Sequence, residues 1–245
     1  MSIFVFQHTD AEHLSLLGDI LNQRRIPVRY FPLHRGFPPP SPDDLWREAK
    51  GLVVLGGPMG VYEAEKYPWV KPGMDVIAQA LRRDFPVYGI CLGSQLMAGA
   101  LGARVYPGEA KKEIGWFPVR LTAEGKRDPL LAGEADGFTV FQWHGDTFDL
   151  PEGAALLVSS ERYPHQAFRI GRHGYAFQFH LETAPEDIHR WLRVFAGDLR
   201  SPRSDADPAE ILARMPAAIG ELNARAERLF CRWLELAGYP SPGQG

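Results

Sequence analysis

The sequence predicts an α/β fold: an open, mixed and mostly parallel sheet flanked by helices, with a helical extension at the C-terminus. Three observations favour this class. Short apolar runs alternate with segments of helical spacing over residues 3–101. From residue 104 onward the pattern changes to a series of strands, and a polar break at residues 197–208 separates these strands from a last helical segment.

The strand–helix alternation begins at the N-terminus. Residues 3–6 predict a strand and residues 11–23 a helix, with Asp10 as its N-cap. The next elements are a strand at 27–31, a stiff proline-dense spacer at 37–42, a short helix from Asp43, a strand at 51–55, a helix at 69–83, a strand at 86–90 and a helix at 94–101 ended by Gly102.

The second half of the sequence, from residue 104 onward, predicts mostly strands. These lie at 104–106, 115–121, 138–142, 155–159, 166–170 and 175–179, and a helix follows at 185–195 with Thr183 or Ala184 near its cap. Residues 209–236 then show a helical stripe that includes Leu229, Phe230 and Trp233, and we expect this stripe to pack on its own domain. The chain is therefore divided into a domain at 1–197 and a linker with a helical extension at 198–245.

One cysteine lies where a strand gives way to a helix. Gly89 and Gly93 flank Cys91 two positions away on each side, which is the G-x-C-x-G form of a nucleophile elbow. Small neighbours relieve the crowding of so tight a turn, and the free N–H groups of the following helix favour thiolate over thiol. Taken alone, the pattern fits a small buried hydrophobic residue equally well.

A histidine and a glutamate end another apolar strand. Side chains alternate along a strand, so His180 and Glu182 project to the same side. A base whose second nitrogen is held by a carboxylate is what a cysteine nucleophile needs. Because both motifs end strands of one α/β pattern, we expect them to lie at one edge of the sheet.

A glycine-rich turn follows the strand at 51–55, one strand before the elbow. This turn, at residues 56–60, can offer backbone N–H groups to an oxyanion, and the N–H of Leu92 is a second candidate donor.

Four motifs in this order resemble the class I glutamine amidotransferase domain, and look closest to the amidotransferase half of GMP synthase and its stand-alone relatives. The resemblance covers residues 2–196 and implies a flavodoxin-like fold. The motifs are Gly56-Gly57-Pro58, Gly89-Ile90-Cys91-Leu92-Gly93-Ser94-Gln95, Trp143-His144-Gly145-Asp146 and His180-Leu181-Glu182.

The resemblance implies a role for each matching residue. Cys91 would attack the side-chain amide of glutamine and release ammonia, and water would then release glutamate from a thioester. His180 would act as general base and acid, with Glu182 as its orienting carboxylate. Gly57 and Leu92 would supply the oxyanion hole.

Substrate contacts are implied in the same way. Gln95, one turn into the elbow helix, matches a residue that contacts the bound glutamine. The loop that carries Trp143, His144, Gly145 and Asp146 matches one that lines the glutamine pocket. No cofactor and no metal are expected, because thiolate chemistry accounts for the same histidines and carboxylates.

The chain departs from the synthetase members of that family. It carries no P-loop and no ATP-pyrophosphatase loop, so we expect it to need a synthetase partner or another ammonia-accepting enzyme. The small substrate is expected to be glutamine or another γ-glutamyl compound. If the helical stripe packs across a two-fold axis instead, the chain forms a homodimer, and this alternative stays open.

Composition excludes several other classes. The chain has 245 residues and a formal net charge of −3, which gives no electrostatic case for binding nucleic acid. Two cysteines, Cys91 and Cys231, do not make a disulfide framework, and Cys231 is expected to be inert packing. No leader and no membrane-spanning run is recognisable, so we expect a cytoplasmic enzyme.

Three functions stay open at this point. The first is a glutaminase-type amidotransferase that passes ammonia to an acceptor. The second is a γ-glutamyl hydrolase, which would use the same residues on γ-glutamyl amides or peptides with water as the acceptor. The third is a catalytically silent relative that binds a partner, and the intact Cys-His-Glu set argues against it.

Overall fold

The structure is a computed structural model that describes residues 1–240. Its strands are β1 (Ser2–Gln7), β2 (Val28–Pro32), β3 (Ala49–Val54), β4 (Val87–Ile90), β5 (Val105–Pro107), β6 (Glu113–Leu121), β7 (Gly137–His144), β8 (Asp146–Phe148), β9 (Ala155–Ser159), β10 (Ala167–Ile170) and β11 (Gly174–Phe177). Its helices are α1 (Leu16–Gln23), α2 (Pro42–Glu48), α3 (Val70–Arg82), α4 (Leu92–Ala100), α5 (Ala123–Arg127), α6 (Pro185–Val194), α7 (Ala196–Leu199) and α8 (Pro208–Leu236).

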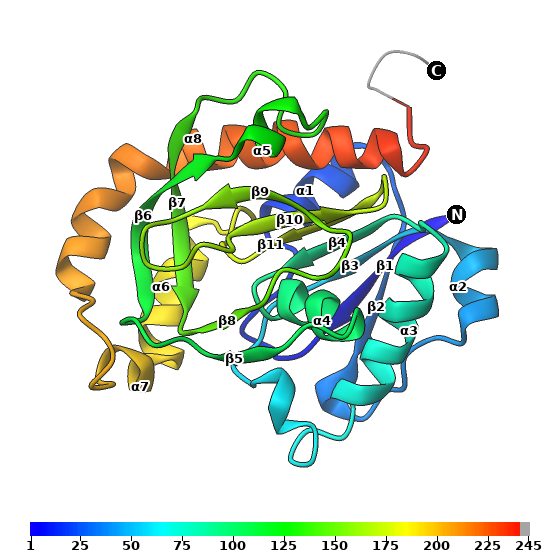
Figure 1. Ribbon diagram of the computed structural model, residues 1–245, viewed down its shortest axis with the longest axis horizontal. Coiled ribbons are helices and arrows are strands. Elements are labelled where there is room, and N and C mark those ends of the chain that lie inside the picture. The colour runs from blue at the N-terminus through cyan, green and yellow to red at the C-terminus, as the bar shows by residue number, and fades with distance from the viewer. Residues whose placement is uncertain (241–245) are drawn as a thin grey trace.

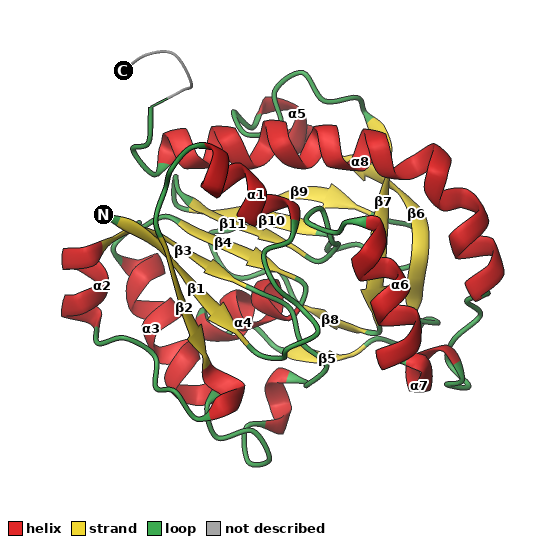
Figure 2. Cartoon of the chain, turned by 180° about the vertical axis from the view of Figure 1, so that it is seen from behind, coloured by secondary structure: helices red, strands yellow, loops and turns green. Residues whose placement is uncertain are grey.

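Within these residues, nine strands form one mixed sheet in the order β2-β1-β3-β4-β11-β10-β9-β6-β7 (Figure 1). Pairing is parallel from β2 to β11 and antiparallel from β11 to β7. A separate antiparallel ribbon joins β5 to β8. Helices cover both faces of the sheet, so the predicted fold class is confirmed (Figure 2).

The parallel half of the sheet is buried on both faces. On β1, Ile3 and Val5 pack with α1 and α8, whereas Phe4 and Phe6 pack on the opposite face with α3 and α4. All four side chains have no exposed surface. The inner strands are therefore continuous apolar runs in the sequence, because the side chains on both faces of each strand pack against helices.

The first helix begins later than the sequence predicts. Helix α1 starts at Leu16, not at residue 11, and the prediction that Asp10 caps it is wrong. The Asp10 carboxylate instead accepts hydrogen bonds from His34 and Arg35. Residues 11–15 form an irregular segment, because Ser15 has a φ of 45°, which an α-helix does not contain; the Ala11 carbonyl accepts a hydrogen bond from the Trp191 indole at 2.9 Å.

Several boundaries differ because of strand pairing. Strand β11 ends at Phe177 rather than at residue 179, since its partner β4 stops opposite it at Ile90. Strand β7 continues to His144 on its longer partner β6, so the predicted loop at 143–146 is instead two strand ends around Gly145. Helix α4 starts at Leu92, two residues before the predicted start at residue 94. The sequence patterns do not predict β8, α5 or α7.

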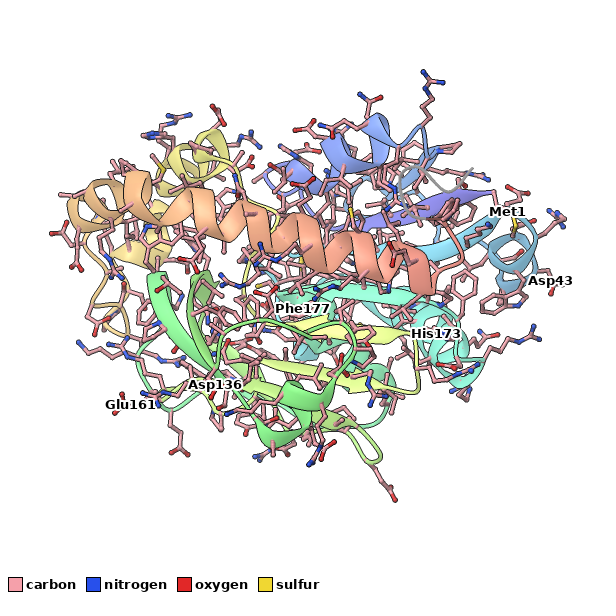
Figure 3. All side chains as sticks on the ribbon, turned by 90° about the horizontal axis from the view of Figure 1, so that it is seen from above. Met1, Asp43, Asp136, Glu161, His173 and Phe177 are labelled. Atoms are coloured by element: carbon pink, nitrogen blue, oxygen red, sulfur yellow. The ribbon has the colours of Figure 1, made fainter. Side chains whose placement is uncertain are left out.

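The long helix α8 packs on its own chain, as predicted from the apolar stripe. Phe230 and Trp233 are fully buried, and the ring of each lies against Tyr88 of β4 with centroids 5.4 Å apart. The Trp233 indole also donates to the carbonyl of His173 at 3.3 Å. Figure 3 shows α8 lying across the sheet, with His173 and Phe177 beneath it. None of the helices in residues 1–240 has the length and apolarity needed to cross a bilayer.

Replacing Trp233 by alanine tests the packing of α8. Truncating a fully buried tryptophan should lower the free energy of unfolding by about 3–5 kcal/mol, because it removes apolar burial and leaves a cavity over Tyr88. Urea denaturation followed by far-ultraviolet circular dichroism measures the change. Val194→Ala is the control, since Val194 is 58% exposed. Equal stabilities of the two variants would contradict the packing described here.

Candidate active site

Cys91 occupies a sharp turn between β4 and α4. Its backbone has φ 51° and ψ −109°, a left-handed conformation that a residue with a side chain rarely adopts. Hydrogen bonds hold the strained turn on both sides. The Cys91 N–H donates to the Phe177 carbonyl at 2.8 Å, and the Cys91 carbonyl accepts from the Ser94 N–H at 2.9 Å and the Ser94 hydroxyl at 2.7 Å.

The two glycines of the motif allow the backbone to approach its neighbours. A Cβ on Gly93 would lie 2.0 Å from the Val54 carbonyl oxygen of β3, and one on Gly89 would lie 2.8 Å from the Gly93 carbonyl oxygen. Neither side chain can be accommodated without moving backbone. The elbow predicted from the glycine spacing is therefore present, with the steric reason that the motif implies.

The thiol of Cys91 is buried and has polar neighbours. Its sulfur lies 3.7 Å from the Trp143 carbonyl oxygen, and the Gln178 side-chain amide donates to it, also at 3.7 Å. The same Gln178 accepts a hydrogen bond from Gln95 at 3.1 Å. Gln178 was missed as a site residue, although strand alternation places it on the same side as His180.

His180 and Glu182 lie together behind the thiol. Nδ1 of His180 is 2.6 Å from Oε1 of Glu182, and the imidazole ring packs edge-on against Trp191 with centroids 4.6 Å apart. The His180 N–H donates to the Phe141 carbonyl at 2.8 Å, which fixes the backbone beyond the end of β11. With Nδ1 engaged, Nε2 is the nitrogen available to the thiol, and His180 lies within hydrogen-bonding reach of Cys91.

At Cys91 and His180, burial and the neighbouring charges shift each pKa in opposite directions. Burial raises the pKa of the Cys91 thiol, and the neighbouring His180 counteracts part of that rise. Burial lowers the pKa of His180, but the charges of Glu182 and Cys91 outweigh it, so the pKa of His180 lies well above its ordinary value. The Glu182 carboxylate thus favours a proton on His180, and the N-terminus of α4 adds a field that favours thiolate at Cys91.

The two predicted oxyanion donors are neighbours. A Cβ on Gly57 would come within 3.0 Å of the Leu92 side chain, and Gly57 lines the same cavity as Cys91. Leu92 is the first residue of α4, so its N–H has no acceptor within the helix. Both groups therefore lie beside the elbow.

The residues predicted to bind substrate line this cavity, but they differ in how far their polar atoms are already hydrogen-bonded within the chain. Both nitrogens of His144 have partners: the Asp146 carbonyl at 2.9 Å and the buried Glu113 carboxylate at 3.0 Å. The Asp146 carboxylate accepts from the Tyr62 hydroxyl at 3.0 Å. The Trp143 indole donates to Asp198 at 3.2 Å. His144 thus fixes the turn at Gly145 and has no free nitrogen for a ligand.

The cavity encloses about 230 Å³ above the elbow. It brings together eight predicted residues: Gly57, Cys91, Gln95, Trp143, His144, Gly145, Asp146 and His180. Glu182 and Leu92 are not among the residues that line it. Charged and aromatic residues that the sequence patterns did not single out complete the wall: Glu12, Tyr62, Glu63, Lys112, Trp191, Phe195 and Asp198. They come from loops, from the single turn at residues 61–63, from α6 and from α7, where no local spacing marks them.

Such an arrangement can cleave an acyl bond by covalent catalysis. A cysteine beside a histidine that a carboxylate orients can attack a carbonyl carbon, and two backbone N–H groups can stabilise the oxyanion that forms. In the described part of the chain no cluster of three His, Cys, Asp or Glu side chains has the geometry to hold a metal ion.

Comparison with known proteins gives consistent results. Residues 18–197 match the family model of class I glutamine amidotransferases. A glutamine amidotransferase-like protein of Salmonella typhimurium is 39% identical over 153 residues, which are 61% of this chain and 62% of that protein. The glutamine-hydrolysing GMP synthase of Porphyromonas gingivalis is 33% identical over 186 residues, or 75% of this chain and 34% of that enzyme. The matches thus span less than two thirds of either relative.

Solved structures resemble the whole chain. A glutamine amidotransferase from Thermotoga maritima superposes with a TM-score of 0.86 at 33% identity, covering 96% of this chain and 98% of that one. A glutamine amidotransferase from Methylobacillus flagellatus gives a TM-score of 0.85 at 29% identity, covering 99% and 97%.

Gly93→Ala tests the close approach at the elbow. The added methyl group would meet the Val54 carbonyl oxygen, so the free energy of unfolding should fall by roughly 3 kcal/mol or more. Gly99→Ala on the same helix is the matched control. Its methyl group would meet the tips of Met74 and Val61, which can move, so a change within about 1 kcal/mol is expected. If urea denaturation finds Gly93→Ala as stable as the parent chain, the steric account of the elbow is wrong.

Proposed function

This chain belongs to the class I glutamine amidotransferase family, and we propose that it hydrolyses the side-chain amide of glutamine through a thioester on Cys91. The observation that best supports this proposal is the His180–Glu182 pair, whose 2.6 Å contact leaves Nε2 of the imidazole to serve the thiol. A buried thiol without an oriented base would support a packing role instead.

The proposed reaction has two halves. Sγ of Cys91 attacks the amide carbon, and the developing oxyanion takes hydrogen bonds from the N–H groups of Gly57 and Leu92. His180 passes the thiol proton to the departing nitrogen, so that ammonia leaves and a γ-glutamyl thioester remains. A water molecule, deprotonated by His180, then attacks the thioester; glutamate leaves and the thiol is restored. Throughout, Glu182 holds the imidazole in place.

We further propose how the substrate is held. The reacting amide would lie at the buried end of the cavity, between Cys91 and His180, which are 6% and 1% exposed. The amino-acid end would lie toward Asp146 and Gln95, with Trp143 and Gly145 forming the adjacent wall. His144 would act through the turn it fixes and would not contact the substrate.

The fate of the ammonia is a separate proposal. One relative is named as a glutamine-hydrolysing GMP synthase, and this chain covers about a third of it (34%). We propose that an acceptor enzyme takes up the ammonia that this chain releases. A γ-glutamyl hydrolase is the alternative, and a panel of γ-glutamyl amides and peptides separates the two: hydrolysis of glutamine alone favours the amidotransferase, and broad cleavage favours the hydrolase.

The division of the chain remains a proposal as well. Residues 1–197 would form the amidotransferase domain, in agreement with the family match at 18–197. Residues 198–245 would form an extension, of which α8 packs on the sheet through Trp233. Asp198 lines the cavity, so the start of the extension lies close to the site. Because the stripe of α8 is buried within the chain, its packing requires no two-fold partner.

Cys91→Ala tests the nucleophile. Glutamate release from glutamine should fall to the uncatalysed background, because no other side chain in the site can form the thioester. An enzyme-coupled assay for glutamate, with ammonia measured in parallel, gives the rate. Cys231→Ala is the matched control: this partly buried thiol lies on α8 away from the cavity, and its removal should leave the rate near that of the parent chain. Substantial turnover by Cys91→Ala would refute the proposal.

His180→Asn and Glu182→Gln test the base and its orienting carboxylate. His180→Asn should lower kcat by roughly 10³-fold or more, because the thiol then has no proton acceptor. Glu182→Gln should cost less, since an amide at the same position can still orient the ring. The ranking of the two losses, measured at saturating glutamine, is the readout. A larger loss in Glu182→Gln than in His180→Asn would exclude the assigned roles.

A further inference from the structure

Glu12 is a buried carboxyl group beside the reactive pair that the proposed mechanism does not use. It lies in the segment between β1 and α1, is 7% exposed, and lines the cavity together with Cys91 and His180. A Cβ on Gly56 would lie 1.9 Å from Oε2 of Glu12 and 3.4 Å from Cβ of Cys91. The carboxyl group and the nucleophile are therefore close neighbours across the bare backbone of Gly56.

The carboxyl group of Glu12 is incompletely satisfied. Among the described residues, Oε2 has no hydrogen-bond partner. A buried polar atom without a partner costs free energy, so its retention in a folded chain calls for a reason. The position of this atom on the cavity wall, next to a nucleophile and its base, suggests that the reason is electrostatic.

Hydrogen bonds tie the Glu12 segment to the elements that carry the base. The Ala11 carbonyl accepts from the Trp191 indole at 2.9 Å, and the Trp191 ring packs on His180. The Leu16 N–H donates to the Glu182 carbonyl at 3.1 Å. The segment is thus held on both sides of Glu12.

Burial raises the pKa of Glu12 to about 7; His180 partly opposes this rise and Glu182 adds to it. In return, the negative charge of ionised Glu12 raises the pKa of the Cys91 thiol. The charge of each of these groups therefore affects the ionisation of its neighbours.

Other charged groups near this segment are neutral or paired. Burial lowers the pKa of His8 to about 4, so this imidazole is uncharged near neutral pH. Arg190, which reaches the Ala11 carbonyl, is paired with Asp187 at 3.1 Å, and His13 contacts the same carboxylate at 3.4 Å. Burial and the charge of Glu182 keep the Tyr88 hydroxyl protonated by raising its pKa.

We propose that Glu12 is a positioning residue of this site, which sets the ionisation of the Cys91–His180 pair through its own charge. Below about pH 7 the carboxyl group is neutral and leaves the pair unaffected. Above it, the carboxylate stabilises imidazolium at His180 and disfavours thiolate at Cys91. The empty site thereby restrains the formation of a reactive thiolate as the pH rises.

Alkylation of Cys91 by iodoacetamide, followed by peptide mass spectrometry, tests this inference on the full chain without substrate. Glu12→Gln keeps the size of the side chain and removes its charge. The parent chain and Glu12→Gln should react at rates within about twofold at pH 6, where Glu12 is neutral. At pH 8 Glu12→Gln should react roughly 3–10-fold faster, and the apparent pKa of alkylation should fall by about 1.

Two controls accompany this measurement. Glu124→Gln removes an exposed carboxylate of α5 that pairs with Arg127 outside the cavity, and should leave the alkylation profile unchanged. Cys231, read from its own peptide in the same samples, should react at equal rates in all three chains. Since no glutamine is present, failure of this inference is distinguishable from failure of the proposed hydrolysis.

Two results would overturn the inference. One is a pH profile of alkylation in Glu12→Gln that coincides with that of the parent chain from about pH 6 to pH 9. The other is a ratio of the two alkylation rates that is the same at every pH, which indicates altered packing rather than lost charge. Should Glu12→Gln fail to fold, ¹³C NMR of glutamate side chains in the parent chain decides. One carboxyl group should titrate near pH 7, and titration of every glutamate below about pH 5.5 would overturn the inference.

Discussion

The contact between the backbone of α4 and the backbone of β3 governs the architecture of the site. Gly93 lies so close to the Val54 carbonyl that no side chain fits between them. This approach holds the turn at Cys91 in a left-handed conformation and sets the N-terminus of α4 at the carboxyl ends of the parallel strands. Strands β1, β3 and β11 end at the same edge of the sheet. The segments that follow these strands therefore bring Glu12, Gly57 and His180 to one thiol.

Burial sets the chemistry of this edge. Cys91, His180 and Glu182 are each at least nine-tenths buried, and moving charges out of water is costly unless they have partners. The Glu182 carboxylate compensates the imidazolium, while the thiol has the amide of Gln178 and the field of the helix. Glu12 adds a fourth ionisable group whose charge changes near neutral pH. The reactivity of the site therefore depends on the sum of these interactions.

The antiparallel half of the sheet supplies the opposite wall. His144, at the end of β7, is locked between Glu113 and the Asp146 carbonyl, and Gln166 also donates to Glu113 at 2.8 Å. This buried, paired network fixes the turn at Gly145 over the elbow. Neighbouring strands can hold this wall rigidly because β7 pairs with β6 over the whole length of β7, from Glu113 opposite His144 to Arg120 opposite Gly137.

The sequence by itself determined the fold class, the elbow at Cys91, and the pairing of His180 with Glu182, because each depends on local spacing: apolar periodicity, two flanking glycines, and alternation along a strand. It did not determine where α1 begins or where β11 ends, since the positive φ of Ser15 and the length of β4 decide these. Glu12 and Asp198 could not be assigned to the site from spacing. Segments far apart in the chain bring them to the cavity, and the burial that shifts the pKa of Glu12 exists only once those segments have packed together.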